Sequence, residues 1–503
     1  MAPVFVDLSA PNDHKWAQPV GFFINNEFVE SKDARTLAVV NPATEEEVAQ
    51  VALASEKDLG EAAEAAVDAF SHPDWRRLSG TDRGEFMFRL ADLMEEHCTS
   101  LASAESLNTG KAYSIALEGY VDDTIKIVCY YAGHADKSFG QVIDTGADKL
   151  AYTLKELIGV CGLVVPWNFP LNMAITKPAP ASCWGNTVIL KPSEVTPLSV
   201  LYLAVLVKEA GFLPGVVNII KGLDPVVGAA MVTHKQTSKI SFTGSTRVGK
   251  ELMKPGSIHL KNLTLETGGK SPLIVFEVSS LDLAAQWAHL GLTFNQGELC
   301  TATTRILVRD TIFDRFLNTL KSITLKYPVG QPFEEKTHLG PLSARIASLG
   351  KEDGAKDILD GRMPSEFKKG SFVSPSIFVD VKPSMRIYQE EIFGPCAVVL
   401  QFKDEDEATR LANDSMCGLG SALSTENISK AHNVARRIEA GMTSEFLSAE
   451  SNKVAQVENS ARQAWRVYYN TKAIHVNIGN ILPMETVHRE QETSDIKLGA
   501  RDA

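Results

Sequence analysis

The sequence predicts an α/β protein with two doubly wound, mostly parallel sheets. Short apolar runs of strand length alternate with longer stretches in which apolar residues recur at helical spacing, as in βαβ units. The alternation stops at Gly268–Gly269 and then starts again, which indicates a second set of strands. A length of 503 residues with 44% hydrophobic content is ample for two cores of this kind.

The segment before residue 156 predicts a β-hairpin followed by helices. Phe22–Val29 has apolar residues on both sides of Asn25-Asn26, which is typical of a hairpin with a two-residue turn. The next stretches show one short strand and then apolar residues at helical spacing. The expected elements are the strand Val48–Ala54 and the helices Glu56–Phe70, Thr81–Cys98 and Asp122–His134.

The strands of the two sheets are predicted from apolar runs that end at polar, glycine or proline residues. The first set contains Glu156–Val165, Thr187–Leu190, Val216–Ile220 and Lys239–Phe242, with a helix over Leu198–Glu209 that Gly211 ends. The second set contains the strands Leu273–Phe276, Ile306–Val308 and Val398–Phe402 and the helices Ile312–Leu325 and Asp406–Asp414.

The charge and the cysteines narrow the class of protein. The net charge of −12 disfavours binding to nucleic acid or to an anionic membrane surface. No apolar run reaches transmembrane length, and the first residues show no secretory signal. The seven cysteines are scattered without Cys-x-x-Cys spacing, so we expect neither a disulfide framework nor a metal site. These features predict a protein of the reducing cytoplasm.

Cys300 is the candidate nucleophile. It lies in the run NQGELCTATT, whose small and polar residues leave a sulfur open to a small molecule. A thiolate is the reactive form, so we expect a site that favours the ionised sulfur, for instance through backbone N–H groups. A structural cysteine is the alternative, and the local sequence alone does not decide between the two.

Asn168 and Glu266 are candidate partners of this cysteine. Asn168 is held between Pro166 and Pro170 after an apolar run, where a fixed amide can donate to an oxyanion. An Asx turn explains the same residue. Glu266 ends an apolar run just before Gly268, so we expect a partly desolvated carboxylate suited to a general base. A salt bridge is its alternative.

Two stretches have the chemistry to hold a dinucleotide. The run Lys239–Phe242 continues into TGSTRVG and then a helix, which offers backbone N–H groups to a pyrophosphate. This is not a Gly-x-Gly-x-x-Gly motif, and a plain strand–turn–helix connection remains the alternative. Lys191 and Glu194 follow another apolar run and can bind ribose hydroxyls, although an exposed loop pair fits equally well.

Six motifs, taken together and in this order, resemble the aldehyde dehydrogenase superfamily, most of all its fungal NAD-dependent members. They are PWNFP, VILKPSE, FTGSTRVG, LETGGKSP, NQGELC and EEIFGP. The resemblance runs from about residue 21 to 442 and resumes over 468–479. It implies a Rossmann-like NAD-binding domain of residues 1–137 and 158–267 and a catalytic domain of residues 268–467. It further implies a small β oligomerisation arm of residues 138–157 and 468–479, and a tail of residues 480–503.

The resemblance also implies a reaction. Cys300 attacks the carbon of a small aldehyde, and Asn168 and the Cys300 backbone N–H stabilise the oxyanion of the thiohemiacetal. Hydride passes to NAD and leaves a thioester, which is hydrolysed to a carboxylic acid by water that Glu266 activates. Through the arm, the chain is expected to form a homodimer or a homotetramer.

The implied cofactor is NAD, without a metal. Lys191 and Glu194 hold the adenosine ribose, and the Glu194 carboxylate favours NAD because it repels a 2′-phosphate. Glu391 and Phe393 contact the nicotinamide ribose. The other implied residues line the cleft and the pyrophosphate turn: Val165, Trp167, Gly244, Ser245, Thr246, Val248 and Gly249.

One segment departs from the family. After Met442 the family continues through a strand into PFGGxKxSGxGRExG, whereas this chain reads TSEFLSAESNKVAQVENSARQAWRV. Thr443–Tyr468, back-translated with freely chosen synonymous codons and read from the third base, gives IRIPFGGVKQSGTGRELGEAGLAS. That is the expected family segment, so we interpret this stretch as translated out of frame.

Polar residues interrupt every apolar run of the aberrant segment Thr443–Val467, so we expect no buried strand in it. The prediction is a catalytic domain that lacks one strand of its sheet, with local disorder in this segment and apolar surface exposed beside it.

Two further interpretations of the function stay open. A CoA-acylating semialdehyde dehydrogenase would share the fold, but such enzymes usually lack a hydrolytic base, and Glu266 is present. A catalytically impaired oligomeric or binding protein would follow if the out-of-frame segment removes part of the site. The sequence does not identify the aldehyde, and both detoxification and a tailoring step of secondary metabolism fit.

Overall fold

The computed structural model describes residues 3–146, 149–277, 280–343, 354–446 and 465–477. The chain forms two compact units, one of residues 1–137 and 157–469 and the other of residues 138–156 and 470–503. Two seven-stranded sheets lie in the first unit, and most of a three-stranded sheet lies in the second. The predicted fold class, two doubly wound and mostly parallel α/β sheets with a small β arm, is confirmed.

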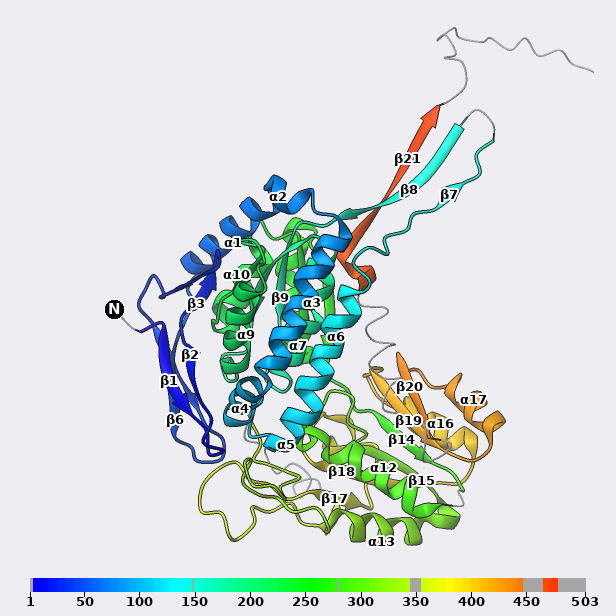
Figure 1. Ribbon diagram of the computed structural model, residues 1–503. Coiled ribbons are helices and arrows are strands. Elements are labelled where there is room, and N and C mark those ends of the chain that lie inside the picture. The colour runs from blue at the N-terminus through cyan, green and yellow to red at the C-terminus, as the bar shows by residue number, and fades with distance from the viewer. Residues whose placement is uncertain (1–2, 147–148, 278–279, 344–353, 447–464, 478–503) are drawn as a thin grey trace, which may run out of the picture. The chain divides into compact units, whose positions relative to one another are not determined.

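The first large sheet is parallel except at one edge. Its strands, in spatial order, are β13 (Asn262–Thr267), β12 (Lys239–Gly244), β9 (Val160–Val164), β10 (Thr187–Lys191), β11 (Val217–Ile219), β3 (Phe22–Ile24) and β4 (Glu27–Val29). The strands from β13 to β11 pair in parallel, and β3 joins β11 antiparallel. The strands β3 and β9 are labelled in Figure 1. The β3–β4 hairpin turns at Asn25 and Asn26, whose φ values of 55° and 61° are those of the predicted two-residue turn.

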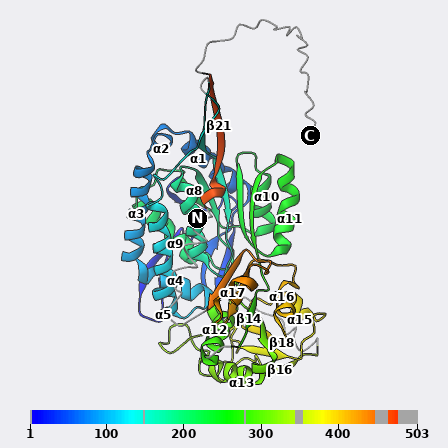
Figure 2. The ribbon, with the colours of Figure 1, turned by 90° about the vertical axis from the view of Figure 1, so that its right-hand side faces the viewer.

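Helices cover both faces of this sheet because successive strand residues point to opposite sides. Cys161 and Leu163 of β9 pack against one group of helices, whereas Val160 and Val164 pack against the other. The first group contains α3 (Gly80–Glu96), α4 (Cys98–Thr109), α6 (Asp122–Ala132), α7 (Pro170–Thr176), α8 (Pro178–Cys183) and α9 (Leu198–Glu209). The second contains α1 (Glu56–Ser71), α10 (Ala229–Thr233) and α11 (Thr246–Gly256). Figure 2 shows α10 and α11 on one side of the sheet and α3, α4 and α9 on the other.

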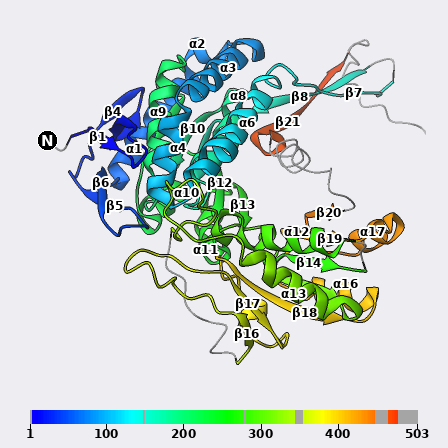
Figure 3. The ribbon, with the colours of Figure 1, turned by 60° about the horizontal axis from the view of Figure 1, so that its bottom comes forward.

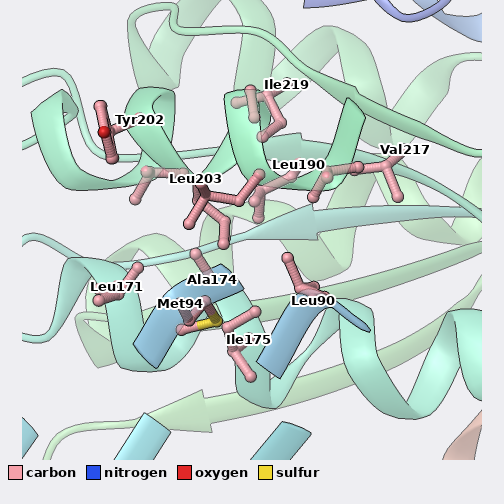
Figure 4. Packing of buried hydrophobic residues seen from close by; sticks show 14 of the residues in the cluster. Leu90, Met94, Leu171, Ala174, Ile175, Leu190, Tyr202, Leu203, Val217 and Ile219 are labelled. Atoms are coloured by element: carbon pink, nitrogen blue, oxygen red, sulfur yellow. The ribbon is translucent and has the colours of Figure 1, made fainter. Parts of the chain in front are cut away.

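The larger core joins the sheet to the helices that carry the candidate site. Figure 4 shows Leu171, Ala174 and Ile175 of α7 facing Leu190 of β10 and Leu203 of α9, all of them buried. Three short elements contribute to the same core: α2 (Pro73–Arg76), which buries Trp75, α5 (Tyr113–Ile115), and the π-helical turn η1 (Ala116–Val121), which joins α5 to α6. The packing of α7 fixes the segment that immediately follows Asn168.

One predicted strand is divided in two. The apolar run Glu156–Val165 was expected to be continuous, but β8 (Lys149–Leu157) ends before Gly159 and β9 starts after it. Gly159 has a φ of 121°, and the Oδ1 atom of Asn186 accepts hydrogen bonds from the N–H groups of Ile158 and Gly159. A left-handed glycine breaks the strand where the side-chain amide takes the place of a neighbouring strand.

The second large sheet is mostly parallel, and its edge strand β16 is antiparallel. Its spatial order is β16 (Lys356–Leu359), β17 (Ser376–Val379), β18 (Cys396–Phe402), β15 (Arg305–Arg309), β14 (Pro272–Val275), β19 (Gly420–Ser424) and β20 (Met442–Phe446). On one face lie α12 (Leu281–Thr293) and α13 (Phe313–Thr324), side by side in Figure 3. On the other face lie α15 (Arg386–Gln389), α16 (Glu405–Asn413) and α17 (Ile428–Ala435).

The prediction that the segment Thr443–Val467 leaves this sheet one strand short is wrong for its first residues, which belong to the strand Met442–Phe446. These residues form β20, which pairs in parallel with β19, and Ser421 Oγ lies 2.7 Å from Thr443 Oγ1. An edge strand has one neighbour instead of two, so it forms without the continuous apolar run of a central strand. Residues 447–464, which carry most of the out-of-frame stretch and its expected disorder, lie outside the described residues.

The three-stranded sheet consists of β7 (Val142–Ile143), β8 and β21 (Tyr469–Asn477), in the order β21-β8-β7. Lys155 Nζ donates to Thr471 Oγ1 at 2.9 Å, and Lys472 pairs with Glu156 at 2.8 Å. Apolar residues of this sheet are exposed, Val142 by 79%.

Two further hairpins pair β1 (Phe5–Ser9) with β2 (Lys15–Pro19) and β5 (Thr36–Val40) with β6 (Glu47–Ala52). In the described part of the chain, no helix has the length and apolarity needed to span a membrane.

A buried ion pair links α4 to the segment around Asn168. Lys111 Nζ lies 2.8 Å from Glu105 Oε1, and Ser199 Oγ donates to the other carboxylate oxygen at 2.6 Å. The same ammonium lies over the rings of Tyr120 and Phe169, at 4.4 and 4.9 Å from their centroids. A buried charge needs such partners because water cannot reach it. The pair therefore holds the aromatic residue next to Asn168.

Replacing one partner of this pair should destabilise the protein more than replacing both. Glu105→Ala leaves the Lys111 ammonium buried and unpaired, so we expect the free energy of unfolding to fall by about 3 kcal/mol or more. In the double variant Glu105→Leu, Lys111→Met, apolar side chains fill the space and most of the loss should be recovered. Urea unfolding measures both; equal losses in the two variants would contradict the assignment.

Candidate active site

The loop before Cys300 has an unusual backbone. After α12 the chain passes through Asn295, Gln296 and Gly297 with φ values of 52°, 57° and 74°, so three successive residues are left-handed. Each non-glycine residue in this conformation costs about 1 kcal/mol or more, so the surroundings must hold the loop. A Cβ atom at Gly297 would overlap the backbone of Gly394 and Pro395. The NQGELC and EEIFGP motifs therefore pack backbone against backbone.

A second glycine brings a third motif to the same place. A Cβ atom on Gly269 would lie 2.6 Å from the carbonyl oxygen of Cys300, so only glycine allows this approach. The Gly269 N–H donates to Glu391 Oε1 at 3.1 Å, and a Cβ on Gly268 would overlap the same carboxylate. The segment that follows β13, the Cys300 loop and the EEIFGP motif therefore meet at these two glycines.

Asn168 is tied to the Cys300 loop by hydrogen bonds. Its side chain is buried, and its Nδ2 donates to the Glu298 carbonyl at 2.8 Å. Asn295 Nδ2 donates to the carbonyls of Asn168 and Glu298 at 3.1 and 2.9 Å. An amide nitrogen carries two hydrogens, and among the described residues Glu298 is the acceptor for one of them. The other is left to donate to a ligand. No role was predicted for Asn295, because its left-handed backbone depends on contacts that the sequence does not show.

The surroundings of Cys300 keep its sulfur protonated. Burial, together with the charges of Glu391 and Glu266, raises the pKa of Cys300 to about 11. The N–H groups of Cys300 and Thr301 act in the opposite direction but do not compensate. The expectation that the resting site favours a thiolate is therefore wrong for this structure, because desolvation outweighs the backbone donors.

Glu266 lies in β13, at the edge of the first sheet, and it is exposed. The partial desolvation expected from the apolar residues before it is absent, because an edge strand leaves one side open to water. Its charge still reaches Cys300 and Lys177.

Lys177 was not predicted from the sequence. It is buried, donates to Ser241 Oγ at 2.9 Å, and burial lowers its pKa to about 8. A lone lysine in the apolar run AITKPAPA was the available signal.

Two aromatic residues predicted for the cofactor cleft face each other. The rings of Trp167 and Phe393 lie 5.1 Å apart in an edge-to-face arrangement. Phe393 has a φ of 60°, so its position is held by its neighbours, and Val165 is buried and donates to the Lys191 carbonyl. Glu391 is exposed on one side, yet the protein atoms around it raise its pKa.

Lys191 and Glu194 also lie together, with a third partner. Lys191 Nζ is fully buried and lies 3.6 Å from Glu194 Oε2 and 2.5 Å from Asp224 Oδ1. Asp224 was not predicted, although it shares the signal that singled out Lys191, a charged residue shortly after an apolar run.

The pyrophosphate turn is a strand–helix connection. Ser245 caps α11, with its Oγ accepting from the Val248 N–H at 3.3 Å, and Thr246 starts this helix of 11 residues. A Cβ on Gly244 would clash with the Phe242 ring, and one on Gly249 would lie 3.2 Å from Thr267. The turn is thus closely packed and presents the unpaired N–H groups of a helix start.

The charged side chains and backbone N–H groups of these residues match the groups that a dinucleotide presents. Trp167, the lysine–carboxylate cluster and the helix start follow the carboxyl ends of β9, β10 and β12, which are neighbours in one parallel sheet, and Phe393 comes from the segment before β18. Ligands of such sheets bind at the carboxyl ends of the parallel strands. The cluster offers cationic and anionic groups for hydroxyls, and the helix start offers N–H groups for phosphates.

The sequence model of the aldehyde dehydrogenase family matches residues 28–453 of this chain. The chain belongs to the aldehyde dehydrogenase family. The match ends within the stretch that we interpret as out of frame.

Similar proteins and solved structures support the same family. The aldehyde dehydrogenase of Emericella nidulans is 43% identical over 88% of this chain and 90% of the relative. The aldehyde dehydrogenase [NAD(P)+] 2 of Saccharomyces cerevisiae is also 43% identical, over 88% of this chain and 90% of the relative. The NAD+ complex structure of an aldehyde dehydrogenase from Bacillus cereus has a TM-score of 0.87 at 38% identity and covers 92% of this chain and 97% of that one. The predicted family and enzyme class, an NAD-dependent aldehyde dehydrogenase, are confirmed at the level of the family.

Substituting Gly297 should disrupt the aldehyde dehydrogenase site. Gly297→Ala places a Cβ on a left-handed residue and against the Gly394–Pro395 backbone, so the loop must shift away. We expect a loss of aldehyde oxidation of about tenfold or more and a loss of stability of about 2 kcal/mol. Gly60→Ala in α1, where nothing lies within 4 Å, is the matched control. Unchanged turnover of Gly297→Ala would show that the loop contact does not hold the site.

The protonated thiol predicts how alkylation of the aldehyde dehydrogenase depends on pH. Only the thiolate reacts, so the rate at which iodoacetamide modifies Cys300 should keep rising until the pH approaches about 11. Glu391→Gln removes a charge that raises this pKa and should speed the reaction at neutral pH. Cys300→Ser identifies the Cys300 signal by mass spectrometry. A rate that levels off near neutral pH would refute the raised pKa.

Proposed function

We propose that this chain oxidises a small aldehyde to the carboxylic acid with NAD, through a covalent intermediate on Cys300. The observation that carries the proposal is the convergence of three motifs on one sulfur-bearing loop. Gly269 lies against the Cys300 carbonyl, Gly297 against Gly394–Pro395, and Asn168 donates to the carbonyl of Glu298.

The first step forms the carbon–sulfur bond. Because the pKa of Cys300 is raised, the thiol must lose its proton as the sulfur attacks the aldehyde carbon. The proton of the thiol passes to solvent water, so Glu266 can still accept a proton in the later hydrolysis. The electron pair of the carbonyl moves to oxygen, which gives a thiohemiacetal oxyanion.

The oxyanion needs donors that are already in place. The second N–H of the Asn168 amide and the backbone N–H of Cys300 are the proposed pair. The bond to Glu298 orients the amide before the substrate arrives, so the enzyme need not reorganise as charge develops.

The later steps use the cleft at the edge of the first sheet. NAD, when bound, accepts the hydride of the thiohemiacetal. Trp167 and Phe393 are proposed to hold its nicotinamide end together with Glu391, and Lys191 and Glu194 its adenosine ribose. The carbon that has lost hydride stays on Cys300 as a thioester. Glu266 then takes a proton from water, the water oxygen attacks the thioester, and the acid leaves as the sulfur regains a proton.

Each of the three regions has its own proposed role. Residues 1–137 and 158–267 would bind NAD, residues 268–467 would carry the nucleophile, and residues 138–157 and 468–479 would join copies of the chain into a homodimer or homotetramer. The exposed apolar residues Val142, Leu150 and Leu154 on the small sheet support that last role. Seven free cysteines support a reducing, cytoplasmic location. A CoA-acylating reaction is less favoured, because Glu266 supplies a hydrolytic base.

Two variants test the proposed roles. Cys300→Ser should abolish NADH formation while calorimetry still shows NAD binding, because the cofactor contacts lie elsewhere. Glu266→Gln should slow steady-state turnover more than the first turnover, because it acts mainly in hydrolysis. Cys129→Ser, at another partly exposed cysteine, is the control. Turnover that survives Cys300→Ser would remove the central assignment.

A chain in which the in-frame reading replaces residues 443–468 is the positive control. Activity in that chain alone would show that the out-of-frame stretch impairs the enzyme, as the binding-protein interpretation requires.

A further inference from the structure

A strip of polar side chains lies on one face of the first large sheet, across β12 and β13. The two strands pair in parallel, so that Ser241 lies beside Thr264 and Thr243 beside Glu266. Alternate residues of a strand point to the same side, so these four side chains share one face. The residues between them are apolar and pack into the core on the opposite face: Ile240, Phe242, Leu263 and Leu265.

Three buried side chains continue this polar strip away from Glu266. Lys177 directly follows α7, and its Nζ donates to Ser241 Oγ at 2.9 Å. Ser241 also forms a side-chain hydrogen bond with Tyr468. Lys177, Ser241 and Tyr468 are all buried. The Tyr468 hydroxyl therefore reaches Lys177 through Ser241.

Tyr468 is held from two sides. It is the last residue of the short 3-10 helix η6 (Trp465–Tyr468) and directly precedes β21. Its carbonyl accepts a hydrogen bond from Asn186 Nδ2 at 2.9 Å, and Lys239 Nζ lies 5.5 Å from the centroid of its ring. Lys239 Nζ is itself fixed, because it donates to Thr264 Oγ1 at 2.7 Å. The hydroxyl of Tyr468 thus has a defined place beside Ser241.

The charge of Lys177 decides how these hydroxyl groups point. An ammonium group carries three donor hydrogens and no acceptor, so Ser241 Oγ accepts from it. The hydroxyl hydrogen of Ser241 is then available to the oxygen of Tyr468. Without that oxygen, the hydrogen would turn to a neutral Lys177 amine, which can accept it. The Tyr468 hydroxyl therefore favours the charged form of Lys177.

Lys177 changes its charge within the pH range in which an enzyme is assayed. Burial is the main reason that its pKa is lowered to about 8; the charge of Glu266 opposes this shift, and that of Lys239 adds to it. Burial also raises the pKa of Tyr468, so its hydroxyl stays protonated. The titrating group that acts on Glu266 from this strip is thus Lys177.

We propose that Tyr468 is a positioning residue for the hydrolysis step: through Ser241 it holds the Lys177 ammonium in place as a cation that supports the base Glu266. The inference rests on the proposed function, in which Glu266 activates water. A cation near a carboxylate favours its ionised form, which is the form that can take a proton from water. The role is electrostatic, and no bond forms or breaks at Tyr468.

Carbon-13 NMR of protein labelled at lysine Cε measures the titration of Lys177 directly, and Lys177→Met identifies its signal. Tyr468→Phe keeps the ring and removes the hydroxyl, so the midpoint should fall by about one pH unit. Ser241→Ala should lower it as well, and adding Tyr468→Phe to Ser241→Ala should change it no further, because Tyr468 acts through Ser241. Tyr469→Phe, whose ring packs against Trp184, is the matched control and should leave the midpoint unchanged.

The pH dependence of kcat separates this role from a structural one. When the midpoint falls by about one unit, the charged fraction of Lys177 at pH 8 falls about fivefold, whereas at about pH 6 it hardly changes. Tyr468→Phe should therefore lower kcat about fivefold at pH 8 and less than about twofold at pH 6. In a Lys177→Met background, Tyr468→Phe should have no further effect on kcat at either pH.

A Lys177 midpoint that Tyr468→Phe leaves unchanged would overturn the inference. An equal loss of kcat at both pH values would also overturn it, because Tyr468 would then only stabilise the fold. Thermal unfolding checks that each variant is folded, and Ser241→Ala carries the same two measurements if Tyr468→Phe does not fold. A wild type that forms no NADH would contradict the proposed function, and the NMR titration then decides whether Tyr468 acts on Lys177.

Discussion

The site depends on a close approach of backbone to backbone at two glycines. Gly297 touches Gly394–Pro395 and Gly269 touches the Cys300 carbonyl, and neither contact leaves room for a Cβ atom. These contacts support three left-handed residues in a row, which the loop would not adopt alone. The hydrogen bonds from Asn168 and Asn295 to Glu298 close the remaining side. The position of the sulfur is thus fixed by contacts that any larger residue would break.

The electrostatics of the site follow from burial more than from pairing. Desolvation raises the pKa of Cys300 and lowers those of Lys177, Lys221 and Lys270. A thiol reacts with oxidants more slowly than a thiolate, so the raised pKa protects Cys300 from oxidation. Glu266 is exposed at the edge of the first sheet, where water can reach its carboxylate.

The elements that were predictable from the sequence are those set by local pattern. Apolar runs gave β10, β12, β14 and β15 to within about two residues, and Asn25-Asn26 gave the hairpin. The break at Gly159 was missed because it depends on the side chain of Asn186, and β20 because its edge position relaxes the need for apolar residues. The resemblance supplied the candidate site. The exposure of Glu266, the left-handed Asn295 and the Lys191–Asp224 pair arise from contacts through space that one sequence does not record.

The central claim is that the carbon of the aldehyde becomes bonded to Cys300. Mass spectrometry of the acid-quenched protein, after mixing with an aldehyde and NAD, tests it most directly. Glu266→Gln is the form to use, because slow hydrolysis lets the thioester accumulate. We expect a mass increase equal to the acyl group less one hydrogen, mapped to the peptide that contains Cys300 and sensitive to hydroxylamine. NADH formed without an adduct, or an adduct on another cysteine, would contradict it.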